Sequence, residues 1–103
     1  MICISTTSDS TDIQKKIASE LLNKKLSPCT HITEIIHCGY IWEDEIVQKN
    51  EFKLEIKTIE SHQKEIISII KENHNYKVFE LSLNKIDSLN SEYNDWFKNQ
   101  FKL

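Results

Sequence analysis

Three side chains that can carry chemistry lie in the segment ENHNYKVFEL, residues 72–81. His74, Tyr76 and Glu80 fall where a helix-like pattern gives way to a strand-like one. The imidazole of His74 and the carboxylate of Glu80 could bind a divalent metal or act as an acid–base pair. The alternative is structural: His74 would close a helix end, where a positive charge is favoured. Glu80 would then pair with a lysine, and Tyr76 would pack with its hydroxyl bonded.

A second candidate site is the pair Cys29 and His31. The two residues are two apart on a predicted strand, so they share a face with their α-carbons roughly 7 Å apart. A thiolate beside an imidazole suits copper or zinc. No further ligand follows at a metal-motif spacing, so a neighbouring subunit would have to complete the site. The alternative is that Cys29 is a small buried residue and His31 a surface one.

The remaining cysteines and histidines offer less chemistry. His31 and His37 share a strand face, but six residues separate them by roughly 20 Å, too far for one ion. Cys3 and Cys38 are expected to be core or interface thiols, and His62 is expected to be exposed.

The motifs of common enzyme classes are missing from the sequence. It contains no GxSxG, no HExxH and no glycine-rich phosphate loop, and its only glycine is Gly39. The carboxylates of residues 43–45 lie in a predicted turn and are expected to be solvated. We therefore expect no enzymatic activity.

Composition restricts the class of protein further. The 103 residues carry a formal charge of −3, and every one of the 13 basic residues is a lysine. Without the guanidinium fork, recognition of phosphates and bases is disfavoured, so we expect no nucleic-acid partner. No apolar run approaches the length of a membrane span and no signal peptide is recognisable. An odd number of cysteines without CxxC spacing fits reduced thiols, so we expect a cytoplasmic protein.

Hydrophobic periodicity predicts seven elements in a single domain, residues 1–103. Helical spacing of Ile13, Ile17 and Leu21 follows a cluster of capping side chains at residues 8–12, and strict alternation marks residues 52–58 as a half-buried strand. The predicted elements are a strand at 2–7, a helix ending before Pro28, strands at 29–42 and 52–58, a helix capped by Ser61 and ending near Asn73, a strand around Phe79–Leu83, and a C-terminal helix. The last helix carries the aromatic stripe Tyr93, Trp96, Phe97 and Phe101, which we expect to be buried.

Residues 29–59 are predicted to form a hairpin with unusually long arms. Gly39 is a candidate for a β-bulge, and no proline interrupts the ribbon. Long unprotected strand edges invite pairing with another chain, which predicts an oligomer built through the sheet. Tyr40 and Trp42 are then expected at the contact between subunits, where such residues are enriched.

The element order β-α-β-β-α-β with an added C-terminal helix is the ferredoxin-like α+β sandwich. At this level of detail the chain resembles the CutA family of divalent-cation tolerance proteins from end to end. The matching pieces are Thr6 and Thr7, LSPC ending at Cys29, YIWE from Tyr40, IKT at residues 56–58, HNYKVFEL at 74–81 and YNDWF at 93–97.

The resemblance implies a homotrimer related in architecture to the PII signalling proteins, and a role in the response to copper and other divalent cations. The resemblance supports His74 and Glu80 as metal ligands, beside Cys29 and His31, which are candidates by their donor chemistry. We expect folding to require no cofactor. An unidentified protein partner is compatible with the resemblance. Two alternatives stay open: a metal-independent trimeric scaffold or signalling subunit, and a small enzyme with a site between subunits.

Six positions depart from the family pattern. Asp9, Asn75 and Phe79 stand where proline is usual. Glu34 and Ile35 replace a Pro-Gly pair, and Asp44 occupies the usual glycine of the hairpin turn. None is an apolar core position by pattern, so the fold is expected to survive, while the geometry of the Asp44 turn and of the Asn75 loop is in question.

Overall fold

The computed structural model describes residues 1–101 as a four-stranded sheet with helices. It confirms the predicted α+β order. The elements are β1 (Ile2–Ser8), α1 (Thr11–Asn23), β2 (Cys29–Trp42), β3 (Glu45–Thr58), a 3-10 turn (Glu60–His62), α2 (Gln63–Asn73), β4 (Leu81–Lys85) and α3 (Ser91–Asn99). Among these residues, no helix is both long and apolar enough to cross a membrane.

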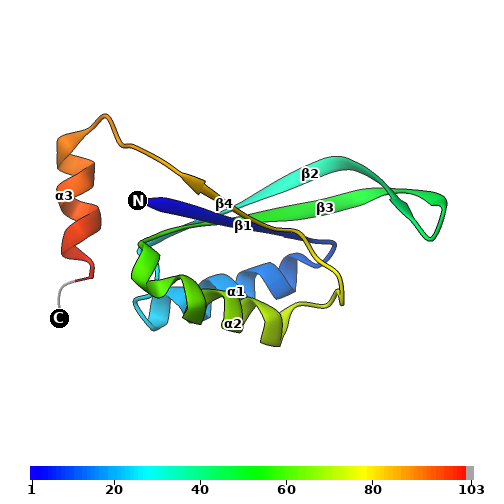
Figure 1. Ribbon diagram of the computed structural model, residues 1–103, viewed down its shortest axis with the longest axis horizontal. Helices are drawn as coiled ribbons and strands as arrows, with labels where there is room; N and C mark the ends of the chain where they lie inside the picture. Colours follow the sequence, from blue (N-terminus) through cyan, green and yellow to red (C-terminus); the bar gives the residue numbers. More distant parts are fainter. Residues whose placement is uncertain (102–103) are drawn as a thin grey trace.

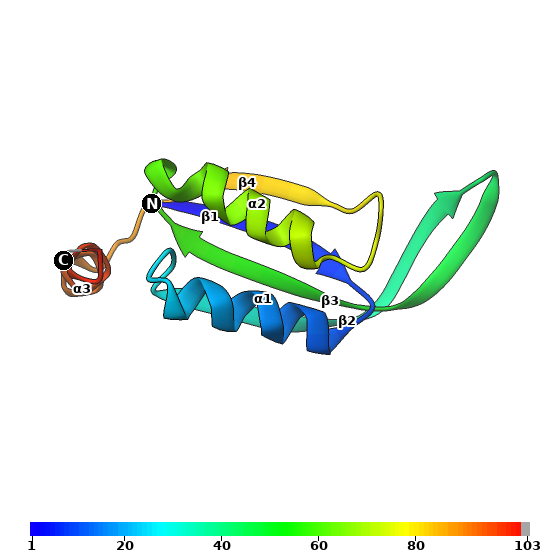
Figure 2. The same cartoon turned by 90° about the horizontal axis from the view of Figure 1, so that it is seen from below.

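The sheet is antiparallel throughout, with strand order β2-β3-β1-β4. Helices α1 and α2 lie side by side on one face, and the other face is left open (Figures 1 and 2). Ser10 caps α1 by accepting a hydrogen bond from the Ile13 backbone N–H, as the cluster of capping residues predicts.

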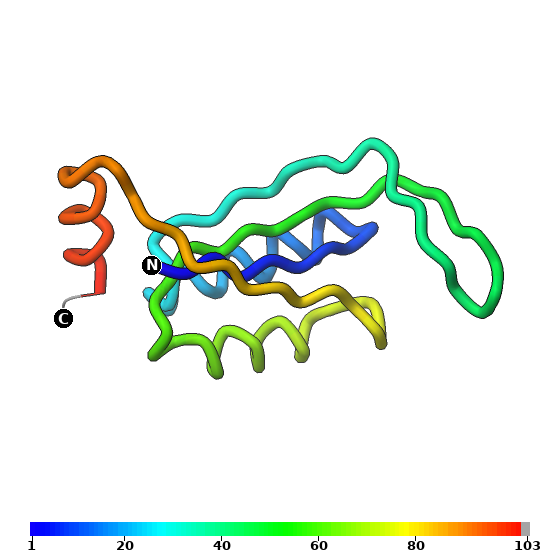
Figure 3. The backbone as a smooth tube through the Cα atoms, turned by 45° about the horizontal axis from the view of Figure 1, so that its top comes forward, coloured from blue at the N-terminus to red at the C-terminus, as the bar shows by residue number. Residues whose placement is uncertain are grey.

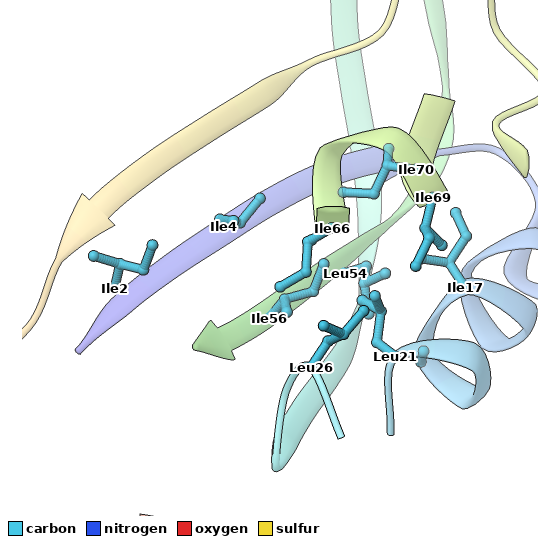
Figure 4. Packing of buried hydrophobic residues seen from close by; sticks show 11 residues of the cluster. Ile2, Ile4, Ile17, Leu21, Leu26, Leu54, Ile56, Ile66, Ile69 and Ile70 are labelled. Carbon is cyan, nitrogen blue, oxygen red and sulfur yellow. The ribbon is translucent and has the colours of Figure 1, made fainter. Parts of the chain in front are cut away.

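The core lies between this helical layer and the sheet (Figure 4). Alternation in β3 places Leu54, Ile56 and Thr58 on the covered face, where each is fully buried. The helices contribute side chains at helical spacing, as expected. The largest apolar side chains that are fully buried are Ile4, Ile17, Leu21, Leu54, Ile56, Ile66 and Ile70.

The hairpin of β2 and β3 projects well beyond the rest of the molecule (Figures 1 and 3). Each strand has 14 residues, and pairing continues to Trp42 opposite Glu45. The expected bulge at Gly39 is wrong in position: Gly39 pairs regularly with Gln48, and the irregularity lies between Ile35 and Cys38. An extra residue on one strand bends the ribbon there, so the hairpin changes direction before its tip.

The start of α2 differs from expectation. Ser61 lies inside the 3-10 turn, and the residue at the helix N-cap is His62, whose side chain makes no capping bond. His62 is half-buried rather than exposed, because its Nδ1 lies 3.2 Å from the Leu26 carbonyl oxygen and its ring packs 5.3 Å from that of Phe101. These partners are distant in the sequence, so no local pattern indicates them.

The C-terminal aromatic stripe is only partly buried. Phe97 is 3% exposed, but Trp96 is 42% exposed. Helix α3 stands off the end of the sandwich at the far side from the hairpin tip, so only part of its surface meets the body (Figure 1). The strand expected around Phe79–Leu83 begins later, at Leu81. The expectation that none of the six departing positions belongs to the core is wrong for Phe79, which packs against the core from the preceding segment.

The hairpin turn retains the usual two-residue geometry without glycine. Glu43 and Asp44 have φ angles of 49° and 65°, both left-handed, as a type I′ turn requires. We expect Asp44→Gly to raise the free energy of unfolding by about 0.5–1 kcal/mol, because glycine adopts this conformation without steric cost. Urea denaturation at fixed protein concentration measures the change. Glu45→Gly, at a paired strand position, is the control and should be destabilising; an Asp44→Gly protein no more stable than wild type would contradict the argument.

Candidate functional site

A cavity of about 660 Å³ lies along the distal half of the hairpin, from Glu51 and Cys38 to Trp42 beside the turn. Its walls come from parts of the chain that are distant in sequence: the end of β1, Cys38 and residues 40–42 of β2, Lys49 and Glu51 of β3, and the segment 76–80. Tyr40 and Trp42 contribute aromatic surface, and Trp42 is 48% exposed. Their expected contact with another subunit stays a prediction.

Glu51 is the buried polar centre of this cavity. It is 4% exposed, and among residues 1–101 no ion pair involves it. The Tyr76 hydroxyl donates a hydrogen bond to Glu51 Oε2 at 2.7 Å, and the Cys38 thiol donates to Oε1 at 3.2 Å. Burial, followed by the bond to Glu51, raises the pKa of Tyr76 to about 12. The hydrogen bond to Glu51 is the main cause of a raised pKa of the Cys38 thiol, and burial is the next cause. Both donors therefore keep their protons at neutral pH.

Lys49 and Asp9 extend the network to the rim. Their charged groups lie 3.3 Å apart, and the Lys49 ammonium stands 4.7 Å from the centre of the Tyr76 ring. Tyr76 is the main cause of a raised pKa of Lys49. Partial burial raises the pKa of Asp9, but hydrogen bonds from Asn75 and Lys49 outweigh it, so the net shift is downward. The ion pair is therefore formed at neutral pH.

Asn75 joins the two segments at this rim. Its Oδ1 accepts a hydrogen bond from the Ser8 hydroxyl at 2.6 Å, and its Nδ2 donates to Asp9 Oδ1 at 2.7 Å. Asp9 and Asn75, two positions where the resemblance leads us to expect proline, are thus direct partners. Side-chain hydrogen bonds hold the loop that a proline would otherwise stiffen.

His74 is held as a neutral imidazole. Its Nε2 donates to the Thr7 carbonyl oxygen at 2.9 Å, and its Nδ1 accepts from the Tyr76 backbone N–H at 3.0 Å. The ring also stacks on Phe79 with centroids 4.3 Å apart. With both nitrogens bonded to backbone, His74 has no hydrogen bond to Glu80 in the part of the chain described. It occupies the C-cap of α2, the position that the structural alternative predicts, but as a neutral ring rather than a cation. The lysine partner expected for Glu80 is not found among residues 1–101.

This arrangement makes stability depend on pH. Burial, which outweighs the bond to Thr7, lowers the pKa of His74 below its usual 6.5. Between the lowered pKa of His74 in the folded protein and its ordinary pKa of 6.5 in the unfolded chain, the unfolded chain binds more protons. The contribution of His74 to stability is therefore fully present above pH 6.5 and falls as the pH drops below it. We expect His74→Gln to reduce the stability difference between pH 7 and pH 5.5, measured by urea denaturation, while the exposed His37→Gln leaves it unchanged. An equal pH dependence in wild type and His74→Gln would refute this role.

Cys29 and His31 lie elsewhere, on the open face of the sheet. Cys29 Sγ is 3.8 Å from His31 Nε2, which confirms that the two side chains share a face. Nine residues of β2 separate Cys29 from Cys38 at the cavity, roughly 30 Å along the strand. The four ligands expected from the sequence therefore lie in two places. His74 and Glu80 are near the cavity, and Cys29 and His31 are at the other end of the sheet. Within residues 1–101 there is no group of three or more His, Cys, Asp or Glu side chains placed to hold a metal ion.

The cavity network is the part of the site that sequence reasoning missed. Glu51 follows the same alternation as Lys53 and Glu55, which predicts a solvated carboxylate on a strand face. Tyr76 was singled out by its place beside His74, but its bond to Glu51 spans 25 positions of sequence. No local signal indicates that the segment 76–80 covers this part of the hairpin.

Comparison with known proteins identifies relatives along nearly the whole chain. The family model described as CutA1 divalent ion tolerance protein matches residues 2–100. The divalent-cation tolerance protein CutA of Thermotoga maritima is 31% identical over 98 residues, covering 95% of this chain and 96% of the relative. The divalent-cation tolerance protein CutA of Thermococcus kodakarensis is 35% identical over 95 residues, covering 92% of this chain and 90% of the relative. The solved structure of the periplasmic divalent cation tolerance protein CutA from Archaeoglobus fulgidus has a TM-score of 0.89 at 28% identity, covering 99% of this chain and 100% of that one.

Proposed function

The chain belongs to the CutA1 divalent ion tolerance family, and from that premise we propose that it is a cytoplasmic homotrimer that binds copper or another divalent cation, a partner protein, or both. The family is one of tolerance proteins rather than named enzymes, and we propose a non-enzymatic role. The three cysteines are all free thiols, which suits a reducing compartment.

The pair of Cys29 and His31 carries the metal-binding part of the proposal. A thiolate and an imidazole are the donors that copper and zinc prefer over the oxygen-only sets of magnesium and calcium. The separation of 3.8 Å between Sγ and Nε2 is close to the spacing of two ligands on one ion, and both side chains are accessible. His31 would coordinate through Nε2, and Cys29 would lose its proton on binding.

The exposed hairpin supports the trimer. Several large apolar side chains on it have no cover within one chain, and such patches commonly mark association surfaces. They are Ile36 and Ile41 at 79% and 75% exposed, Ile46 at 75% and Trp42 at 48%. The open face of the sheet and the free edge of β2 offer a second copy further surface and unpaired backbone groups.

A metal-independent trimeric scaffold or signalling subunit is the second candidate. It is favoured by the lack, within residues 1–101, of any assembled group of three metal-ligating side chains. The cavity around Glu51 would then be the place where a partner or small ligand contacts the trimer.

Native mass spectrometry during zinc and copper titration tests both candidates. We expect a particle of about three times the 12.2 kDa chain mass. The wild type and His37→Gln should take up metal, and Cys29→Ser and His31→Gln should lose most of that uptake. A trimer whose mass and melting temperature do not respond to micromolar metal would favour the scaffold. A monomer would contradict both.

A further inference from the structure

We propose that Glu55 is the third ligand of the Cys29–His31 site, so that one chain can hold a zinc-class divalent cation through a thiolate, an imidazole and a carboxylate. The inference rests on the proposed metal-binding function and adds a residue to it. Glu55 carries no motif, and its place among lysines on an alternating strand indicates only a solvated carboxylate.

The pairing of β2 with β3 brings the three residues together. His31 is directly opposite Glu55, and Cys29 is opposite Lys57, so Glu55 is the cross-strand neighbour of His31 and the diagonal neighbour of Cys29. Directly opposed side chains have their Cβ atoms about 4.5–5.5 Å apart, and diagonal ones lie about 7–8 Å apart. Leu54 and Ile56, on either side of Glu55, are fully buried beneath the helices, so Glu55 points to the open face.

The first two ligands are already near the required spacing. Zinc bonds of about 2.3 Å to sulfur and 2.0–2.1 Å to nitrogen place the two atoms roughly 3.5 Å apart in a tetrahedral site. Cys29 Sγ and His31 Nε2 are 3.8 Å apart, so a shift of a few tenths of an ångström suffices.

As the side chains lie within residues 1–101, Cys29, His31 and Glu55 do not form an assembled group of metal ligands. The carboxylate of Glu55 must therefore turn to complete the site. In its present rotamer, Oε2 lies 3.9 Å from the Cys3 thiol on the neighbouring β1, a long and weak contact with a sulfur donor. Glu55 is only partly buried, and a change of its side-chain rotamer would carry the carboxylate from the β1 side, where Cys3 lies, to the β2 side, where His31 lies. The cost is the loss of this one contact, and a metal–carboxylate bond replaces it.

The charges at this place are compatible with a divalent cation. A thiolate and a carboxylate together neutralise its two positive charges. The cross-strand partner of Cys29 is Lys57, whose ammonium lies over the Tyr93 ring of α3 at 5.5 Å from its centre. The mixed sulfur, nitrogen and oxygen set selects zinc-like ions over magnesium and calcium, and the fourth position is free for water or for a group from another molecule.

Calorimetric titration of the full chain with Zn²⁺ and Cd²⁺ tests the assignment. We expect Glu55→Gln to raise the Kd about tenfold or more, while the ultraviolet sulfur-to-cadmium absorption persists at saturation because Cys29 still binds. Cys29→Ser should lose that absorption. Glu34→Gln, the same chemical change on β2, is the matched control and should leave the Kd unchanged. Circular dichroism melting confirms that each variant is folded.

The outcomes separate this inference from the function it rests on. An unchanged Kd in Glu55→Gln overturns the role of Glu55 but leaves metal binding by Cys29 and His31 intact. Equal weakening by Glu34→Gln and Glu55→Gln also overturns it, because a loss of negative charge would then explain both results. Failure of the wild type to bind Zn²⁺ or Cd²⁺ removes the metal-binding part of the proposed function as well.

Discussion

The double variant Ile41→Asp/Ile46→Asp is expected to be a monomer. The two isoleucines are cross-strand partners near the hairpin tip, and each is 75% exposed in a single chain. Surface substitutions usually change stability by about 0.5 kcal/mol or less, so the isolated subunit should tolerate this change apart from a modest loss of strand propensity.

Burial between subunits would make the same change severe. Fully burying an isoleucine side chain is worth about 1.5–3 kcal/mol, and a carboxylate placed there without a partner carries a further desolvation cost. Two such positions recur in every subunit of a trimer. We therefore expect the assembly to dissociate, even though neither residue contributes to the core of its own subunit.

Light scattering coupled to size exclusion measures this directly. The mass should fall from about three chains to the 12.2 kDa of one, with far-ultraviolet circular dichroism retained. Ile41→Val/Ile46→Val, which keeps apolar β-branched side chains, is the control and should remain a trimer. A double aspartate variant that stays trimeric would show that the hairpin tip is not part of the subunit contact.

Removing the hydroxyl of Tyr76 is expected to cost about 1.5–3 kcal/mol of unfolding free energy, the range for a hydrogen bond to a charged group. The hydroxyl donates to Glu51 at 2.7 Å and accepts from the Asp9 backbone N–H at 3.0 Å. In Tyr76→Phe the carboxylate stays buried with only the weaker Cys38 thiol as its donor. Urea denaturation at pH 7 measures the loss.

Tyr93→Phe provides a matched control for this experiment. Within the described residues the Tyr93 hydroxyl is buried without a hydrogen-bond partner. The same chemical deletion there should be neutral or slightly stabilising, because it removes an unsatisfied buried group. Equal effects at the two tyrosines would mean that the bond to Glu51 contributes nothing specific.

The positions that depart from the family pattern are accommodated by local substitutes. The Asp9–Asn75 bond holds one loop, and Phe79 stacks on His74 where proline is usual. Glu34 and Ile35 continue β2 in regular pairing with Phe52 and Glu51. The bulge follows directly after Ile35, which shows that the strand still bends without the Pro-Gly pair.

Local periodicity was enough to derive the element order, the helix-covered face of the sheet, the long hairpin and the shared face of Cys29 and His31. These features depend on repeats of 2 and 3.6 residues and on capping side chains, and such signals are carried by neighbours in the chain. The α+β class follows from that order.

Contacts between distant segments decided the rest. Glu51 is a buried centre because Tyr76 and Cys38 reach it from two other elements, and the four expected ligands separate because His74 and Cys29 lie at different ends of the sheet. The register of β2 against β3 places Glu55 opposite His31. That register depends on the pairing of the two strands along their whole length. Burial and register depend on how distant segments of the chain pack together. The alternation along a single strand is the same whether its charged side chain contacts water or a tyrosine, so it could not identify Glu51 as buried.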